Sequence, residues 1–267
     1  AGFAMMTAGV AYYVASAGNA GIVQVSHTLL GTVLATAGAL ALNQYLEREA
    51  DALMQRTRTR PLPSGRLRPR DALLFGLLLV VGGVAHLWAT VGQLPALLTL
   101  LSAAAYNLVY TPLKPRSHAA TFAGAVPGAM PALIGWSAAT GEVDVGSLVL
   151  FGIAFLWQIP HVLSLAWILR EDYARVGFLM MPPADPEGRL IGGHMVLYTA
   201  ALLPVSLLPT PLGLTGGIYL IGATVLGGGF LWWSIAASRA MERAAVRRVF
   251  FASLAYQPLL LGLMLID

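Results

Sequence analysis

The chain has 267 residues, of which 57% are hydrophobic and only 10% are charged. An ordinary soluble domain carries about 25% charged residues, so the composition excludes that class and indicates an integral membrane protein. The net charge is +4, and the absence of cysteine excludes disulfides, thiolate metal sites and a cysteine nucleophile.

Nine apolar segments follow one another, separated by glycine, proline or charged residues. They are too long for barrel strands, and backbone groups in lipid must be bonded within their own segment, so they predict an all-α bundle of nine transmembrane helices. We expect one transmembrane domain over residues 1–267, with a truncated first helix because residue 1 already lies in apolar sequence. The predicted spans are 1–17, 22–45, 71–91, 94–111, 119–139, 146–169, 190–208, 214–236 and 246–265.

All 16 lysines and arginines fall at the connections between predicted spans two and three, four and five, six and seven, or eight and nine, where Arg247 and Arg248 overlap the first residues of the ninth span. The positive-inside rule therefore places these connections in the cytoplasm. The compact loops favour a multi-pass protein of a bacterial plasma membrane over one of the mitochondrial inner membrane. The lipid bilayer is thus an expected partner. Nucleic acid is not, because no soluble domain or aromatic platform accompanies the arginines.

The densest group of charges is "NQYLEREADALMQRTRTRPLPSGRL", residues 43–67. Asn43, Glu47 and Asp51 are four residues apart, and each such step turns a helix by about 40°, so the three side chains share one face and Glu49 does not. Their oxygen atoms suit Mg²⁺, which usually takes one or two protein carboxylates together with substrate phosphate oxygens. The alternative is a solvated helix end, but Asn43 lies inside a predicted span, where polar groups are usually functional.

Further polar residues lie on the same predicted side of the membrane. Arg56 and Arg60 follow the stripe formed by Asn43, Glu47 and Asp51, and guanidinium groups suit phosphate. After the sixth span, Glu171 and Asp172 precede Arg175, which could simply pair with Asp172 at i, i+3. If the bundle brings both connections over one cavity, two acidic sites and several cations would surround a diphosphate.

The polar stretch resembles the first motif of the UbiA superfamily of intramembrane prenyltransferases, Asn-x-x-x-acid-x-x-x-Asp followed by Arg-Thr-x-x-Arg-Pro-Leu-x-x-Gly. Four later stretches narrow the resemblance to the haem-farnesylating branch of that superfamily. These are "YTPLKPRS", "GAVPGAMPALIGWSAATG", "PHVLSLAWILREDYARVGFLMMP" and "RRVFFASLAYQPLLLGLMLID". The resemblance runs in order from about residue 40 to the end of the chain.

The resemblance implies nine helices around a central cavity, with Mg²⁺ as cofactor, farnesyl diphosphate and haem B as substrates, and haem O as product. It implies a metal site at Asn43, Glu47 and Asp51, and a second acidic site at Glu171 and Asp172, of which Asp172 would also contact metal. The diphosphate contacts implied are Arg56, Arg60, Lys114 and Arg175. The next haem-modifying enzyme is an expected partner.

In the implied reaction, the metal and the cations stabilise the departing diphosphate, the haem vinyl group attacks the allylic carbon, and water captures the resulting cation. Aromatic faces stabilise such cations, and we consider Trp157, Tyr106 and Tyr110 for this role. His161 follows Pro160 inside the sixth span and has two interpretations, a contact to haem or a hydrogen bond to a neighbouring helix.

Three alternatives remain open from the residues. A related prenyltransferase acting on a quinone or chlorin precursor would share the motif at residues 43–51. A secondary transporter with an intramembrane acidic site would predict inverted repeats, and no convincing repeat is seen. A substrate-free scaffold for oxidase assembly gives no reason for the stripe of carboxylates.

Overall fold

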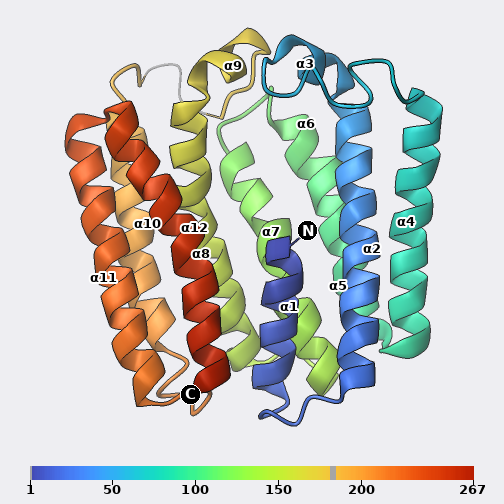
Figure 1. Ribbon diagram of the computed structural model, residues 1–267, viewed down its shortest axis with the longest axis vertical. Helices are drawn as coiled ribbons and strands as arrows, with labels where there is room; N and C mark the ends of the chain where they lie inside the picture. Colours follow the sequence, from blue (N-terminus) through green and yellow to red (C-terminus); the bar gives the residue numbers. More distant parts are fainter. Residues whose placement is uncertain (1, 181–184) are drawn as a thin grey trace.

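The computed structural model describes residues 2–180 and 185–267, and every regular element in these ranges is a helix (Figure 1). The elements are α1 (Gly2–Ala15), α2 (Ile22–Leu46), α3 (Arg48–Leu53), α4 (Pro69–Thr90), α5 (Gln93–Ala104), η1 (Ala105–Tyr110), α6 (Thr111–Leu113), α7 (Ala120–Thr140), α8 (Val145–Ile168), α9 (Arg170–Arg175), α10 (Arg189–Leu207), α11 (Gly217–Ala240) and α12 (Arg243–Ile266).

The long helices agree with the predicted spans to within a few residues. In the described ranges, eight helical spans are long and apolar enough to cross a membrane, and α1 is a shorter apolar helix. The segments α5, η1 and α6 form one of these spans, over 93–113. The prediction of an all-helical membrane bundle is therefore confirmed.

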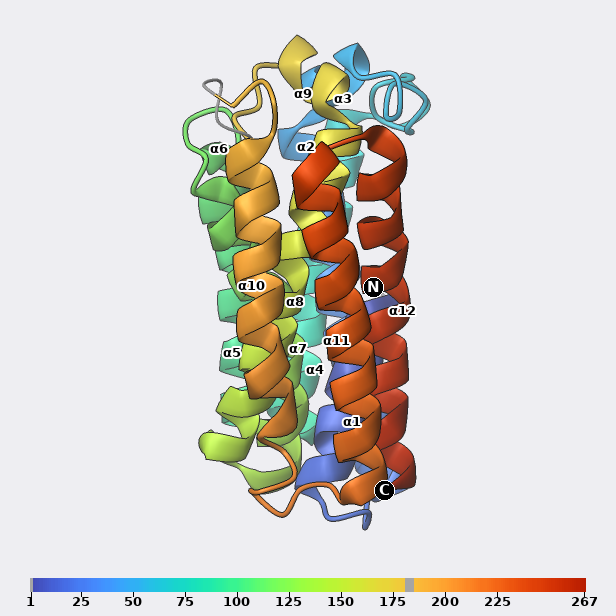
Figure 2. The ribbon, with the colours of Figure 1, turned by 90° about the vertical axis from the view of Figure 1, so that its left-hand side faces the viewer.

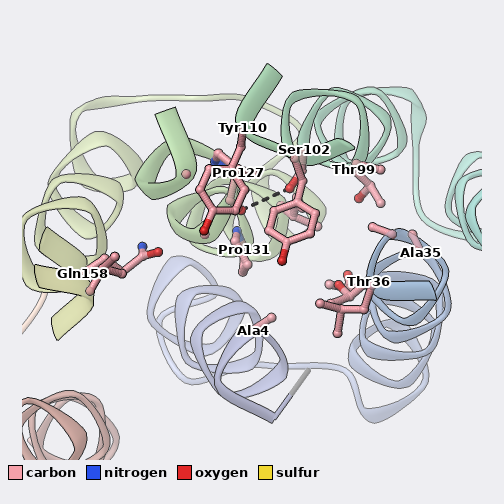
Figure 3. A pocket seen from close by; sticks show the side chains of 18 of the residues that line it. Ala4, Ala35, Thr36, Thr99, Ser102, Tyr110, Pro127, Pro131 and Gln158 are labelled. Atoms are coloured by element: carbon pink, nitrogen blue, oxygen red, sulfur yellow. Dashed lines mark hydrogen bonds between the residues drawn. The ribbon is translucent and has the colours of Figure 1, made fainter. Parts of the chain in front are cut away.

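The long helices run side by side, and the two short helices α3 and α9 lie together at one end of the bundle (Figures 1 and 2). The connections with the lysines and arginines in or beside them lie at this same end. The alternation of the helices along the chain and the view in Figure 1 agree on this. We call it the charged end. Helices α1, α2, α5, α7 and α8 surround a cavity in the interior (Figure 3).

Local sequence signals set several helix ends. Pro69 occupies the first turn of α4, where its missing N–H costs nothing. Gly141 ends α7 in the left-handed conformation at φ 80°. Asp144 begins α8 with a capping box, because its carboxylate accepts from the Ser147 backbone N–H and the Ser147 hydroxyl accepts from the Asp144 N–H, both at 3.0 Å.

Helices α2 and α4 pack closely because glycines face each other across the interface. A Cβ atom on Gly38 would lie 2.6 Å from the Gly76 carbonyl oxygen, and one on Gly83 would lie 2.6 Å from the Gly31 oxygen. Small residues allow this backbone approach in membranes, where dispersion contacts replace the hydrophobic effect between helices. The interface fixes α2, which carries Asn43, the first residue of the polar stripe formed by Asn43, Glu47 and Asp51.

Candidate active site

The polar stripe lies at the charged end, where α2 ends and α3 begins. Asn43 is in the last turns of α2, Glu47 lies between the two helices, and Asp51 is in α3. The sequence does not predict the break at Glu47. The helical spacing nevertheless survives, because the Glu47 N–H donates to Asn43 O at 2.9 Å and the Asp51 N–H donates to Glu47 O at 2.7 Å. All three side chains line one cavity of about 170 Å³, which we call the polar cavity.

The two carboxylates of the stripe are buried, and each is beside one cation. Asp51 is 1% exposed, and its Oδ2 accepts from Arg60 Nη1 at 2.7 Å. Glu47 Oε1 lies 2.6 Å from Lys114 Nζ, an ion pair without hydrogen-bond geometry. Glu49 has an 87% exposed side chain, as the helical period predicts. Both carboxylates of the stripe therefore face inward, and Glu49 does not.

The amide orientation of Asn43 follows from its neighbours. Thr111 has one hydroxyl proton, which it donates to Tyr106 O at 2.9 Å, so its oxygen accepts from Asn43 Nδ2 at 2.9 Å. Asn43 Oδ1 is therefore the end of the amide that remains for another partner. The Tyr106 carbonyl also accepts the Thr111 N–H, because η1 is a π-helix, a form frequent at functional sites.

The stripe fits a hard divalent cation in its donor set. Asp51 Oδ1 is buried and has no hydrogen-bond partner in the described part of the chain, which is costly for an anionic oxygen. Residues 2–180 and 185–267 contain no group of three or more histidine or carboxylate side chains placed for a metal. Two carboxylates and an amide oxygen suit Mg²⁺ that completes its coordination with phosphate oxygens and water.

Cations and aromatic rings form the rest of the polar cavity. Arg56, Arg60 and Lys114, three of the four predicted diphosphate contacts, line it, and Arg175 does not. Lys114 Nζ lies 4.5 Å from the centre of the Tyr110 ring and 5.6 Å from that of Phe178. These contacts hold the ammonium group over aromatic faces and beside Glu47. The cavity is therefore lined by both anionic and cationic side chains.

The predicted second acidic site lies on α9, next to the end of α3. Asp172 Oδ1 accepts from Arg175 Nη1 at 3.0 Å and lies 3.5 Å from the Gln55 backbone N, so α9 does approach the end of α3. However, Glu171 and Asp172 do not line the polar cavity, and Glu171 lines a separate hollow beside α9. The residue of α9 that faces the polar cavity is Tyr173. Residues two apart on a helix differ by about 200°, so Glu171 cannot share its face.

Tyr173 is a residue that the sequence did not single out. Burial raises the pKa of its hydroxyl above the ordinary tyrosine range, and the nearby positive charges of Arg56 and Lys114 act in the opposite direction. The hydroxyl therefore stays protonated at neutral pH and can donate a hydrogen bond to an anion in the cavity.

A second, apolar cavity of about 270 Å³ adjoins the polar one (Figure 3). Tyr106 and Tyr110 line both, so the two cavities meet at these rings. Small residues and prolines of α2 and α7 form much of the apolar wall. Pro131 removes the N–H that would bond the Pro127 carbonyl, and Ser102 Oγ donates to that oxygen at 3.1 Å instead.

His161 lies between α8 and α12 and does not line either of these two cavities. Its ring stacks between Trp157 and Phe250, at centroid distances of 5.2 and 5.0 Å. Ser253 gives its hydroxyl proton to Phe250 O, so it accepts from His161 Nδ1 at 2.8 Å, and Nε2 is left as an acceptor. The neighbouring-helix hydrogen bond of the second interpretation is therefore present. Trp157 also lies outside both cavities and donates to Ser253 O.

A membrane-embedded helical bundle with an acidic and basic cavity that adjoins an apolar one defines an intramembrane enzyme of the prenyltransferase class. The sequence matches the UbiA prenyltransferase family over residues 4–255, and the chain belongs to this family. Because this is a family of prenyltransferases, the chain is an enzyme, as the sequence predicted.

Relatives with similar sequences support this assignment, and solved structures share the fold. The chain is 47% identical to the protoheme IX farnesyltransferase of Solibacter usitatus over 93% of its own length and 85% of the relative's. It is 44% identical to the protoheme IX farnesyltransferase of Opitutus terrae, over 92% of this chain and 83% of the relative. Digeranylgeranylglyceryl phosphate synthase has the same fold, with a TM-score of 0.80, 16% identity and coverage of 98% and 92%. A UbiA homologue from Archaeoglobus fulgidus bound to GPP and Mg²⁺ also has this fold, with a TM-score of 0.61 and 15% identity. The match covers 100% of this chain and 97% of the homologue.

Proposed function

We propose that the protein transfers the farnesyl group of farnesyl diphosphate to a vinyl group of haem B and so forms haem O. The observation that carries this proposal is the junction of the polar and apolar cavities at Tyr106 and Tyr110. One substrate with a diphosphate head and a long apolar chain matches this pair of cavities. The identities of 47% and 44% to protoheme IX farnesyltransferases favour haem as the acceptor.

The polar cavity would bind the diphosphate. In our proposal, Asn43 Oδ1, Glu47 and Asp51 hold Mg²⁺, which supplies positive charge to the departing phosphate oxygens. Arg56, Arg60 and Lys114 would contact diphosphate oxygens directly, and Tyr173 would donate a hydrogen bond. Asp172 and Arg175 form an ion pair at the rim, so we assign them to the approach of α9 toward the diphosphate, and Glu171 to its outer face.

The farnesyl chain would occupy the apolar cavity. The C1–O bond then lies beside Tyr106 and Tyr110, whose ring faces stabilise the allylic cation as the bond breaks. The vinyl π electrons form the new C–C bond, and no protein nucleophile is required. Because the apolar wall excludes most water, the cation survives long enough to meet the haem vinyl group.

His161 is the proposed haem contact of α8. Its Nδ1 is engaged by Ser253, and its Nε2 has no hydrogen-bond partner among the described residues. The stacked rings of Trp157 and Phe250 keep the imidazole in place. The charged end is proposed to face the cytoplasm, following the positive-inside rule.

The experiment uses membranes that contain the protein, haem B, farnesyl diphosphate and Mg²⁺, with extracted haems identified by mass spectrometry. The proposal expects a hydroxyethylfarnesyl haem that disappears without Mg²⁺ and falls about 10²–10³-fold in Asp51→Asn. The matched control is Glu49→Gln, because this carboxylate is exposed and outside the cavity. Consumption of farnesyl diphosphate without a haem product would overturn the proposed acceptor, and no consumption by folded protein would overturn the reaction.

A further inference from the structure

Gln158 places a fixed hydrogen-bond acceptor in the wall of the apolar cavity. Its Nε2 donates to Ala154 O at 3.0 Å and to Ala125 O at 3.4 Å, which engages both amide hydrogens. The amide oxygen is therefore the end directed to the cavity, and Figure 3 shows it pointing away from α8 toward the centre of the space. An amide oxygen accepts hydrogen bonds and cannot donate them.

The glycine at position 128 makes room for this oxygen. A Cβ atom built on Gly128 would collide with Gln158 Oε1. Other polar groups of the same wall are occupied differently: the hydroxyls of Thr32, Thr99 and Ser102 donate to backbone carbonyls. The oxygens of these hydroxyls can also accept, but Gln158 differs because its two amide donors fix the direction of its oxygen.

The proposed reaction needs such a group after the carbon–carbon bond has formed. The vinyl carbon next to the porphyrin ring then carries a positive charge, which has two fates. Water can add to it and give the hydroxyl group, or a neighbouring C–H proton can leave and give an alkene. Water adds through an oxygen lone pair, and an acceptor that holds its hydrogens on the far side favours this addition over proton loss.

We propose that Gln158 binds and orients the water that captures the haem-side cation; this inference rests on the proposed function. One water hydrogen is donated to Gln158 Oε1, and an oxygen lone pair forms the C–O bond. The farnesyl C–O bond breaks with its electron pair on the diphosphate, and the vinyl π pair forms the C–C bond. The proton lost by the added water passes to the released diphosphate in the polar cavity. Its path crosses the junction of the two cavities, which Tyr106 and Tyr110 line on both sides.

Two variants with different chemistry test the inference. Gln158→Met removes the acceptor at similar side-chain length. Gly128→Ala keeps the amide but displaces its oxygen, and alanine favours the helix, so folding is retained. Ser102→Ala is the matched control, because it removes a polar group of the same wall whose proton is already given to Pro127 O.

The measurement is the ratio of hydroxylated to dehydrated farnesyl haem, read by mass spectrometry in water enriched in ¹⁸O. We expect both test variants to shift the ratio toward the dehydrated product by about tenfold, the upper range for the loss of one hydrogen bond, while Ser102→Ala does not. An unchanged ratio in both, with label incorporated as in the wild type, overturns the role of Gln158 and leaves the farnesyl transfer intact. A wild-type protein that makes no farnesyl haem overturns the proposed function and this inference together.

Discussion

The Glu47–Lys114 ion pair gives a prediction whose size follows from burial. The two side chains are 9% and 11% exposed, and their charged atoms lie 2.6 Å apart. Lys114→Met leaves the Glu47 carboxylate buried without its cation, because the nearby Arg60 is already engaged by Asp51. Breaking a buried pair in this way costs about 3–5 kcal/mol of unfolding free energy.

The double variant Glu47→Gln/Lys114→Met separates stability from catalysis. It removes both charges, and exchange of a whole buried pair for neutral groups is often neutral in stability. We therefore expect it to regain most of the unfolding free energy lost in Lys114→Met. We expect no regain of prenyl transfer, because the proposed Mg²⁺ ligand is absent.

The assay is reversible unfolding in mixed detergent micelles, combined with farnesyl transfer. Arg189→Met is the matched control, because its pair with Glu187 is exposed on both sides and is worth about 0–1 kcal/mol. The reasoning is refuted if Lys114→Met is as stable as the wild type, or if the double variant loses as much stability as the two single variants together.

The remaining predictions concern metal, packing and pH. Asp51→Asn keeps an acceptor for Arg60 but loses the charge, so we expect kcat to fall about 10²–10³-fold and stimulation by added Mg²⁺ to disappear; retained stimulation would contradict the metal assignment. Gly38→Ala should destabilise the α2–α4 interface by about 1–3 kcal/mol, measured by unfolding, because its Cβ meets the backbone of Gly76; an unchanged midpoint would contradict the close approach. Burial raises the pKa of Tyr173, so its contribution is complete below the unfolded value of about 10 and is lost as the pH rises further. The wild type should therefore lose stability relative to Tyr173→Phe only above about pH 10, and a loss at neutral pH would be inconsistent with burial.

Much of the architecture could be predicted from the sequence, because the membrane leaves few alternatives. A backbone in lipid must form helices or a closed barrel, and the apolar segments are too long for barrel strands. All 16 lysines and arginines lie in or beside alternate connections. The stripe from Asn43 to Asp51 was predictable because the helical period alone brings residues four apart to one face. The period survives the break at Glu47, which has no clear signal in the sequence.

Other parts of the site depend on how separate helices meet. The sequence placed Glu171 and Asp172 near the first motif, but the rotation of α9 that turns Tyr173 inward is set by packing. The sequence does not show whether a single glutamine inside an apolar span faces lipid, another helix or a cavity. The role of Gln158 emerges only from the structure, where Gly128 on the facing helix α7 leaves room for its oxygen. The π-helix that exposes the Tyr106 carbonyl to Thr111 is likewise a property of the folded chain.

A competition between acceptors tests the central claim most directly. Membranes containing the protein receive labelled farnesyl diphosphate, Mg²⁺, and equal amounts of haem B and an aromatic quinone precursor, and the label is followed into both. The account predicts label in haem, with about 10²–10³-fold less label in Asp51→Asn membranes. Label in the aromatic compound and none in haem would contradict haem as the acceptor, while leaving the polar and apolar cavities as the site of a different prenyl transfer.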